Sequence, residues 1–135
     1  MMSGTTLKYF APEELKCPTT GQLVLAPGFG EALDAFREKF GQSMTVTSGC
    51  RTNEHNEWLK GRGYPASKNS FHLIGNTKYG TDTCAVDIAR KDGVYAAQLI
   101  KLALNEGWTC GVAKSFIHID LRTRYTELPQ VVYNY

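Results

Sequence analysis

The segment SFHLIGNTKYGTDTCAVDI, from Ser70 to Ile88, contains the pattern that decides the fold. It begins near one of the three histidines of the chain, His72, and ends in a run that predicts a buried strand over Cys84–Ala89. Asp87 lies in this strand between two aliphatic residues, where a carboxylate is costly unless it is paired or coordinates a metal ion. The segment therefore predicts a strand that carries a paired or functional acid.

The flanking sequence predicts an α+β fold with a small, largely antiparallel sheet packed with helices. Phe29, Leu33 and Phe36 recur at helical spacing, and Gly41 is suited to end that helix. Asp92 is suited to cap a later helix. In chain order, we expect a helical turn at 12–15, a helix over 27–40, a strand over 44–47, a helix over 53–60, a strand over 84–89, a helix over 92–105, and strands over 108–112 and 115–121.

The composition is that of an ordinary globular protein. The 135 residues are 42% hydrophobic and 21% charged, which predicts a single domain over residues 1–135 and a monomer. The net charge is +2, without long basic blocks, so we expect no nucleic-acid partner. No apolar run reaches the length of a membrane span, and no signal peptide is visible. We therefore expect cytoplasmic synthesis.

The four cysteines lie far apart and form no C-x-x-C pair. This spacing argues against a structural zinc site built from thiolates. Reduced, buried thiols are the simpler interpretation without a signal peptide. Disulfides remain the alternative, with three pairings that the sequence does not rank.

The strand predicted over 115–121 alternates polar and aliphatic side chains. Period two places His118 and Asp120 on one face and the aliphatic residues Ile117 and Ile119 on the other. The polar face then lines either a site or the solvent. A plain surface pair is the alternative for His118 and Asp120, and Asp87 has the alternative of accepting backbone hydrogen bonds at a strand end.

His72, Asp87 and His118 together offer two imidazole nitrogens and one carboxylate oxygen, a set that suits zinc. A catalytic zinc takes three protein ligands and keeps a fourth position for water. The remaining histidine, His55, lies in a polar helix and is expected to be exposed. The alternative is that His55 replaces Asp87 in a three-histidine zinc site.

The order of these residues resembles a known signature. The motif is similar to S-x-H-x-x-G-x-A-x-D of zinc D-alanyl-D-alanine carboxypeptidases and related murein endopeptidases, which share a fold with the signalling domain of hedgehog proteins; its residues here are Ser70, His72, Gly75, Ala85 and Asp87. Residues 47–51, TSGCR, are similar to the S-G-[YF]-R segment of the family, and residues 116–120 to its last zinc-binding strand. The resemblance covers about Phe10 to Arg122 and leaves 125–135 outside.

Two departures separate this chain from the family pattern. Residues 76–84 intervene before the alanine of the motif, so Asp87 lies fifteen positions after His72. This polar stretch predicts a surface insertion, and loop closure depends only weakly on length, so the ligands can still meet. Ser115 stands three residues before His118, where many members carry an acid.

The resemblance implies a zinc peptidase that hydrolyses a peptide bond in peptidoglycan stem peptides, with zinc held by His72, Asp87 and His118. It leaves His55 out of the metal set, because Asp87 fits the family pattern and His55 does not. Arg51 would bind a substrate carboxylate, with a structural salt bridge as the alternative. Ser70 would bind the peptide or orient its loop.

Asp120 is our candidate for the general base, since it shares a strand face with His118. Its alternative role is to accept a hydrogen bond from a ligating histidine or from Arg122. Glu54 and Asp82 are the next carboxylates to consider.

Other functions stay open at this stage. The missing acid at Ser115 favours a zinc-stapled binding module without catalysis, and a metal-free structural domain is a third hypothesis. If the chain is an enzyme, we expect it to act at the cell wall in a phage or bacterial lytic setting. Carboxypeptidase and L-alanyl-D-glutamate endopeptidase activities both fit, because pocket shape decides the substrate.

Overall fold

The computed structural model describes residues 7–64, 66 and 69–135. The predicted α+β class is confirmed, and every predicted helix and strand is present to within two residues at each end. The elements in chain order are α1 (Pro12–Leu15), α2 (Phe29–Phe40), β1 (Val46–Ser48), α3 (Asn53–Gly61), β2 (Ala85–Ala89), α4 (Gly93–Asn105), β3 (Thr109–Val112), β4 (Phe116–Asp120), α5 (Arg122–Tyr125) and β5 (Val132–Asn134).

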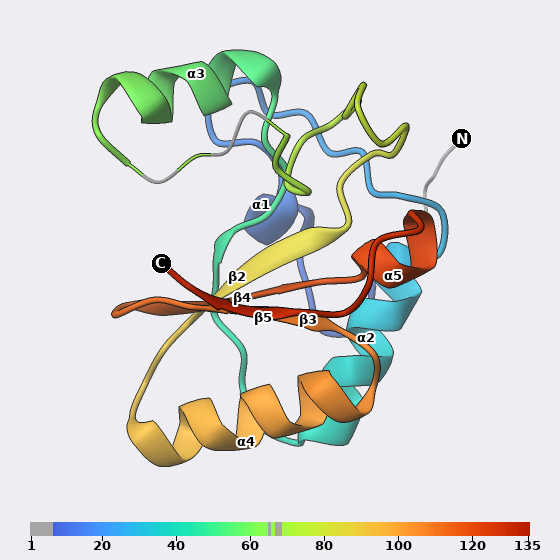
Figure 1. Ribbon diagram of the computed structural model, residues 1–135, viewed down its shortest axis with the longest axis vertical. Helices are drawn as coiled ribbons and strands as arrows, with labels where there is room; N and C mark the ends of the chain where they lie inside the picture. The colour runs from blue at the N-terminus through green and yellow to red at the C-terminus, as the bar shows by residue number, and fades with distance from the viewer. Residues whose placement is uncertain (1–6, 65, 67–68) are drawn as a thin grey trace.

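The five strands form one sheet in the order β1-β2-β4-β3-β5 (Figure 1). The first four strands pair in antiparallel fashion, as predicted, whereas β5 runs parallel to β3. The register places Asp87 of β2 opposite His118 of β4, and Gly111 of β3 opposite the same histidine. Residues paired in this way project from the same face of a sheet. The polar residues of β2 and β4 therefore meet on one face.

The opposite face of the sheet packs against α2 and α4. Ile117 and Ile119 are fully buried there, and Trp108 contacts the rings of Phe29 and Phe36 at centroid distances of 5.7 and 5.2 Å. Helix α4 lies below the sheet in Figure 1, while α1 and α3 lie above it. The aliphatic side chains of β4 thus pack with the two helices on one side, while its polar side chains face the other.

The residues predicted to end α2 and to cap α4 do so in the structure. Helix α2 ends at Gly41, whose φ of 71° is a left-handed conformation that glycine adopts without strain. At the start of α4, the side chain of Asp92 accepts a hydrogen bond from the backbone N–H of Tyr95 at 2.7 Å. These caps fix the two helices that support the sheet.

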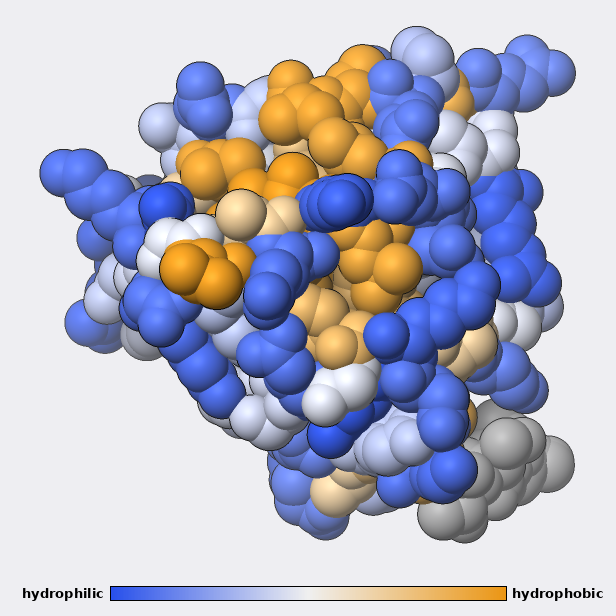
Figure 2. Space-filling model, turned by 90° about the horizontal axis from the view of Figure 1, so that it is seen from below, coloured by the Kyte–Doolittle hydropathy of each residue, from blue (hydrophilic) through white to orange (hydrophobic). Residues whose placement is uncertain are grey.

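The outer side of α4 presents a mixed surface to solvent. Val94 is 68% exposed, and Ile100 and Leu104 are half-buried. Figure 2, which views the molecule from below, shows apolar side chains on this face interrupted by hydrophilic ones. Within residues 7–64, 66 and 69–135, no helix has the length and apolar character that crossing a membrane requires.

The inserted loop folds back on itself and is only partly a surface feature. The backbone N–H of Asn76 donates to the carbonyl of Thr81 at 2.8 Å, which closes the loop. Both ends of the loop are buried, and the ring of Tyr79 stacks on Phe71 with centroids 5.1 Å apart. The predicted surface insertion therefore also contributes the ring of Tyr79, which packs inward on Phe71. All four cysteines are free and buried.

Candidate metal centre

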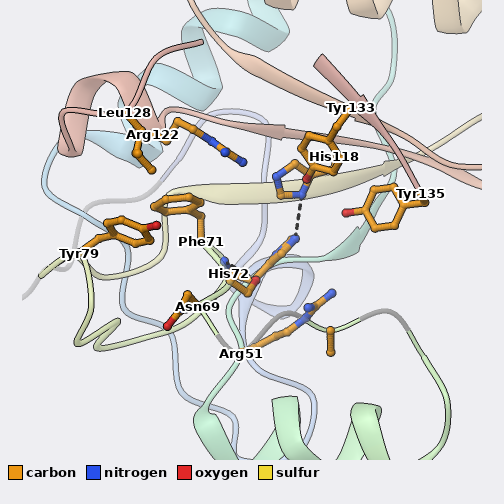
Figure 3. A pocket seen from close by; sticks show the side chains of 12 residues that line it. Arg51, Asn69, Phe71, His72, Tyr79, His118, Arg122, Leu128, Tyr133 and Tyr135 are labelled. Carbon is orange, nitrogen blue, oxygen red and sulfur yellow. Dashed lines mark hydrogen bonds between the residues drawn. The ribbon is translucent and has the colours of Figure 1, made fainter. Parts of the chain in front are cut away.

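Three side chains from separate elements converge on the polar face of the sheet. His72 comes from the loop between α3 and β2, Asp87 from β2 and His118 from β4. His72 Nε2 lies 3.1 Å from Asp87 Oδ1 and 3.2 Å from His118 Nδ1, and His118 Nδ1 lies 3.0 Å from Asp87 Oδ1. All three side chains are buried. Figure 3 shows the two histidines facing each other across this cluster.

The donor atoms of this cluster lie close to the spacing that a tetrahedral metal ion needs. Bonds of about 2.0–2.2 Å to such an ion place its ligand atoms about 3.3–3.6 Å apart. The observed separations of 3.0 to 3.2 Å are shorter by only a few tenths of an ångström. Within the described part of the chain, this is the group of His, Cys, Asp and Glu side chains that could hold a metal ion. A small side-chain adjustment therefore admits the ion.

A backbone carbonyl fixes the orientation of His72. Its Nδ1 donates a hydrogen bond to the carbonyl oxygen of Gly49 at 2.8 Å, which leaves the Nε2 lone pair facing the cluster. A side chain on Gly49 would come within 2.6 Å of the Leu15 carbonyl oxygen, so only glycine permits this close approach to α1. Gly49, two residues before Arg51 in the sequence, thus supports the orientation of His72.

A carboxylate fixes the orientation of His118 in the same way. His118 Nε2 contacts Asp120 Oδ2 at 2.7 Å, so its Nδ1 faces Asp87 and His72. Asp120 also accepts hydrogen bonds from the backbone N–H, Nε and Nη2 of Arg122 at 2.9, 3.0 and 2.9 Å. The side chain of Asp120 is fully buried. Its two oxygens are therefore occupied by His118 and Arg122.

The electrostatics of the cluster are those of a preformed cation site. Burial alone would lower the pKa of His118, but hydrogen bonds with Asp120 and Asp87 raise it to about 9. Burial lowers the pKa of His72. Burial opposes ionisation of Asp87, but the two histidines outweigh it and hold the Asp87 pKa well below its usual value. The cluster thus combines an ionised carboxylate, a neutral imidazole and a proton that a metal ion can displace.

A cavity of about 460 Å³ opens beside the cluster and is lined by His72, His118, Arg51 and Ser70, among others. The Nη2 of Arg51 lies 3.6 Å from Asp87 Oδ2, and its Nε donates to the Ser48 hydroxyl at 3.2 Å. The Ser70 hydroxyl accepts a hydrogen bond from the backbone N–H of His72 at 3.1 Å. The two predicted substrate-binding residues therefore lie at the same cavity as the two histidines of the predicted metal site.

The expectation that His55 is an exposed surface residue is wrong. His55 is only 8% exposed, its Nδ1 contacts the hydroxyl of Thr19, and its ring stacks on Trp58 at 5.6 Å. Helix α3 buries one side against the segment around Thr19, although its sequence is polar. His55 lies outside the metal-compatible group.

The other carboxylates considered from the sequence lie away from the cavity wall. Asp82 accepts a hydrogen bond from the backbone N–H of Gly75 at 2.9 Å, and Glu54 is exposed on α3. Ser115 is exposed at the turn between β3 and β4, where its carbonyl accepts from the N–H of Arg90. None of the described residues that line the cavity is a carboxylate.

Sequence reasoning missed the aromatic walls of the cavity. Phe71 and Tyr79 lie on one side of the histidine pair, and Tyr133 and Tyr135 lie on the other (Figure 3). The alternation in Val-Tyr-Asn-Tyr at 132–135 is a strand pattern that signals both tyrosines on one face. The short length of this run and its position outside the resemblance concealed it.

A family model described as Peptidase M15 matches residues 8–120. No curated protein and no solved structure matches the chain. The matched residues form most of the chain and include the loop and both strands that supply the cluster. The chain therefore belongs to the Peptidase M15 family.

Proposed function

We propose that the chain is a zinc peptidase that hydrolyses a peptide bond in peptidoglycan stem peptides. The bond is that of a D-alanyl-D-alanine carboxypeptidase or an L-alanyl-D-glutamate endopeptidase acting at the cell wall. One observation carries the proposal: two imidazoles and a carboxylate converge within 3.2 Å beside a cavity, in a chain of the Peptidase M15 family.

His72 Nε2, Asp87 Oδ1 and His118 Nδ1 would hold the zinc ion. When bound at such a site, zinc lowers the pKa of water and polarises a carbonyl group. Both imidazoles keep their orientation through the hydrogen bonds to Gly49 and Asp120, which supports a rigid site.

Arg51 would bind the substrate carboxylate. Its guanidinium carries five N–H donors in a planar fork, so it can hold Asp87 and Ser48 and still bind a second carboxylate from the cavity side. Ser70 would keep the loop of His72 in place, because its hydroxyl accepts from the His72 backbone.

The contacts of Asp120 support the orienting role over the general base role. A general base must reach the proton that it removes. Both oxygens of Asp120 already accept hydrogen bonds from His118 and Arg122, and the side chain is fully buried. Asp120 would therefore keep His118 in the correct tautomer and stabilise it as a ligand.

A zinc-stapled binding module without catalysis is the second candidate function. It is favoured by the absence of a carboxylate among the described residues that line the cavity. The two functions share the metal site and differ only in turnover.

The test combines metal analysis with peptide cleavage. We expect the purified protein to bind about one zinc ion per chain and to release D-alanine or a stem-peptide fragment from muropeptides, detected by mass spectrometry. His72→Ala should lose both properties, and His55→Ala should retain zinc. Zinc binding without cleavage of any muropeptide would identify the binding module, and a protein that binds no zinc would contradict both functions.

A further inference from the structure

The last strand of the sheet lies outside the part of the chain that matches the family. The match ends at residue 120, whereas β5 covers Val132–Asn134. Backbone hydrogen bonds fix β5 along β3: the N–H of Cys110 donates to Val131 and the N–H of Tyr135 donates to Val112, both at 3.1 Å. The segment is therefore an ordered wall of the molecule next to the metal cluster.

The register of the sheet aligns β5 with the metal ligands. Asp87 pairs with His118, His118 with Gly111, and Gly111 with Tyr133, so these four residues form one row across four strands on the same face. A side chain on Gly111 would lie 2.6 Å from Cζ of Tyr133. The glycine therefore leaves the space in which the Tyr133 ring lies over β3, with its centroid 5.9 Å from that of His118.

Tyr135 follows two residues later and projects from the same face. Its ring packs edge-on against Phe116 with centroids 5.0 Å apart, and lies 5.5 Å from the ring of Tyr133. Figure 3 shows its hydroxyl pointing toward the histidine pair, on the side where Arg51 lies. Tyr135 is 51% exposed, so a ligand in the cavity can reach it.

We propose that Tyr135 is a catalytic residue that donates a hydrogen bond to the carbonyl oxygen of the scissile peptide, and that Tyr133 is its positioning residue. The inference rests on the proposed function and adds to it a contact from outside the family-matched segment. A phenol is protonated at neutral pH and is therefore a donor. In the free protein the Tyr135 hydroxyl is hydrogen-bonded to the Tyr133 side chain, a partner that the substrate carbonyl would replace. A donor aimed at the oxygen where negative charge develops stabilises the transition state more than the ground state.

Two neighbouring rings hold the side chain of Tyr135 in place. The ring of Tyr135 has Phe116 on one side and Tyr133 on the other, and both of these residues stand on strands of the rigid sheet. Tyr133 is itself held by Gly111, the one strand position in the row without a side chain. Tyr133 thus limits the positions that the Tyr135 hydroxyl can take.

The test compares Tyr135→Phe with the wild type, both loaded with zinc. We expect kcat on a muropeptide substrate to fall by about a hundredfold or more, with KM changed by less than about threefold and zinc affinity unchanged. A phosphinate analogue of D-alanyl-D-alanine, measured by calorimetry, should bind more weakly by a similar factor. Tyr133→Phe should give a smaller loss, because the ring remains in place over Gly111.

Tyr95→Phe is the matched control. The Tyr95 hydroxyl donates to the Ser43 carbonyl at 2.8 Å on the helix side of the sheet, so this variant should lose some stability and keep wild-type kcat. Gly111→Ala provides a second variant that leaves both hydroxyls intact: it should displace the Tyr133 ring and lower kcat while zinc content is kept.

Failure of the inference is distinguishable from failure of the proposed function. Wild-type turnover and tight phosphinate binding by Tyr135→Phe would overturn the role of Tyr135 and leave the peptidase proposal intact. A zinc-loaded wild type that neither cleaves muropeptides nor binds the phosphinate would overturn both. If the wild type binds the phosphinate but cleaves no muropeptide, the peptidase function is overturned. If Tyr135→Phe then binds the phosphinate as tightly as the wild type does, the hydroxyl contact is overturned as well.

Discussion

Replacing Asp120 by asparagine separates the two roles proposed for this carboxylate. One oxygen accepts from His118 Nε2 and Arg122 Nη2, and the other from the backbone N–H and Nε of Arg122. In Asp120→Asn, an NH₂ group replaces one of the two carboxylate oxygens. This NH₂ group would face two hydrogen-bond donors and cannot accept from them, so at least two charge-assisted hydrogen bonds are lost. Breaking a buried charge pair in this way costs about 3–5 kcal/mol.

This magnitude is a large part of the stability of a small domain. We expect the melting temperature of the metal-free variant to fall by about 10 °C or more, measured by circular dichroism. Because Asp120 orients a ligand, zinc affinity should fall by about ten- to a hundredfold in a chelator competition assay. Excess zinc should then restore much of kcat.

The result that would refute this reasoning is the reverse pattern. If Asp120→Asn keeps wild-type zinc affinity while kcat falls by about a hundredfold and excess zinc gives no rescue, Asp120 is the general base. The hydrogen bonds described for its two oxygens would then have to rearrange when substrate binds.

Three further predictions concern the cluster and its neighbours. Asp87→Ala and His118→Ala should each abolish zinc binding, measured by metal analysis after dialysis; full zinc retention by either variant would contradict the ligand set. Arg51→Lys should lower kcat/KM by about tenfold or more, equivalent to about 1.4 kcal/mol, with zinc content unchanged, and wild-type kinetics would exclude the bidentate contact. In the metal-free protein, the raised His118 pKa means that its charge stabilises the fold below about pH 6.5 and that this stabilisation disappears as pH rises through about 9. Urea unfolding across this range should show the loss, and His118→Gln should not.

The convergence of His72, Asp87 and His118 was predictable in part from local patterns, which single out Asp87 and His118, and in part from the family resemblance, which adds His72. Alternation along 116–120 identified the polar face of β4, and the aliphatic neighbours of Asp87 made an unpaired carboxylate too costly. The inserted residues did not prevent the prediction, since the entropic cost of closing a loop grows only slowly with its length.

The features that escaped prediction depend on contacts between distant segments. Nothing local indicates that Gly111 leaves room for the Tyr133 ring, because the parallel pairing of β5 with β3 joins residues more than twenty positions apart. His55 was expected on the surface because its neighbours are polar, yet α3 packs that side against Thr19. Period two placed Asp120 on the face of His118, but it could not decide between the base role and the predicted alternative, the hydrogen bonds from Arg122 that the structure shows.

The parallel strand β5 also covers the backbone edge of β3. Without it, the backbone N–H of Cys110 and the carbonyl of Val112 would lose their partners in Val131 and Tyr135. Strand β3 would then be a terminal strand with unpaired groups and a glycine in its middle, which is a template for pairing with a second chain. A shortened protein that ends before Val131 should therefore tend to aggregate, and its loss of activity would report on solubility as much as on the tyrosines.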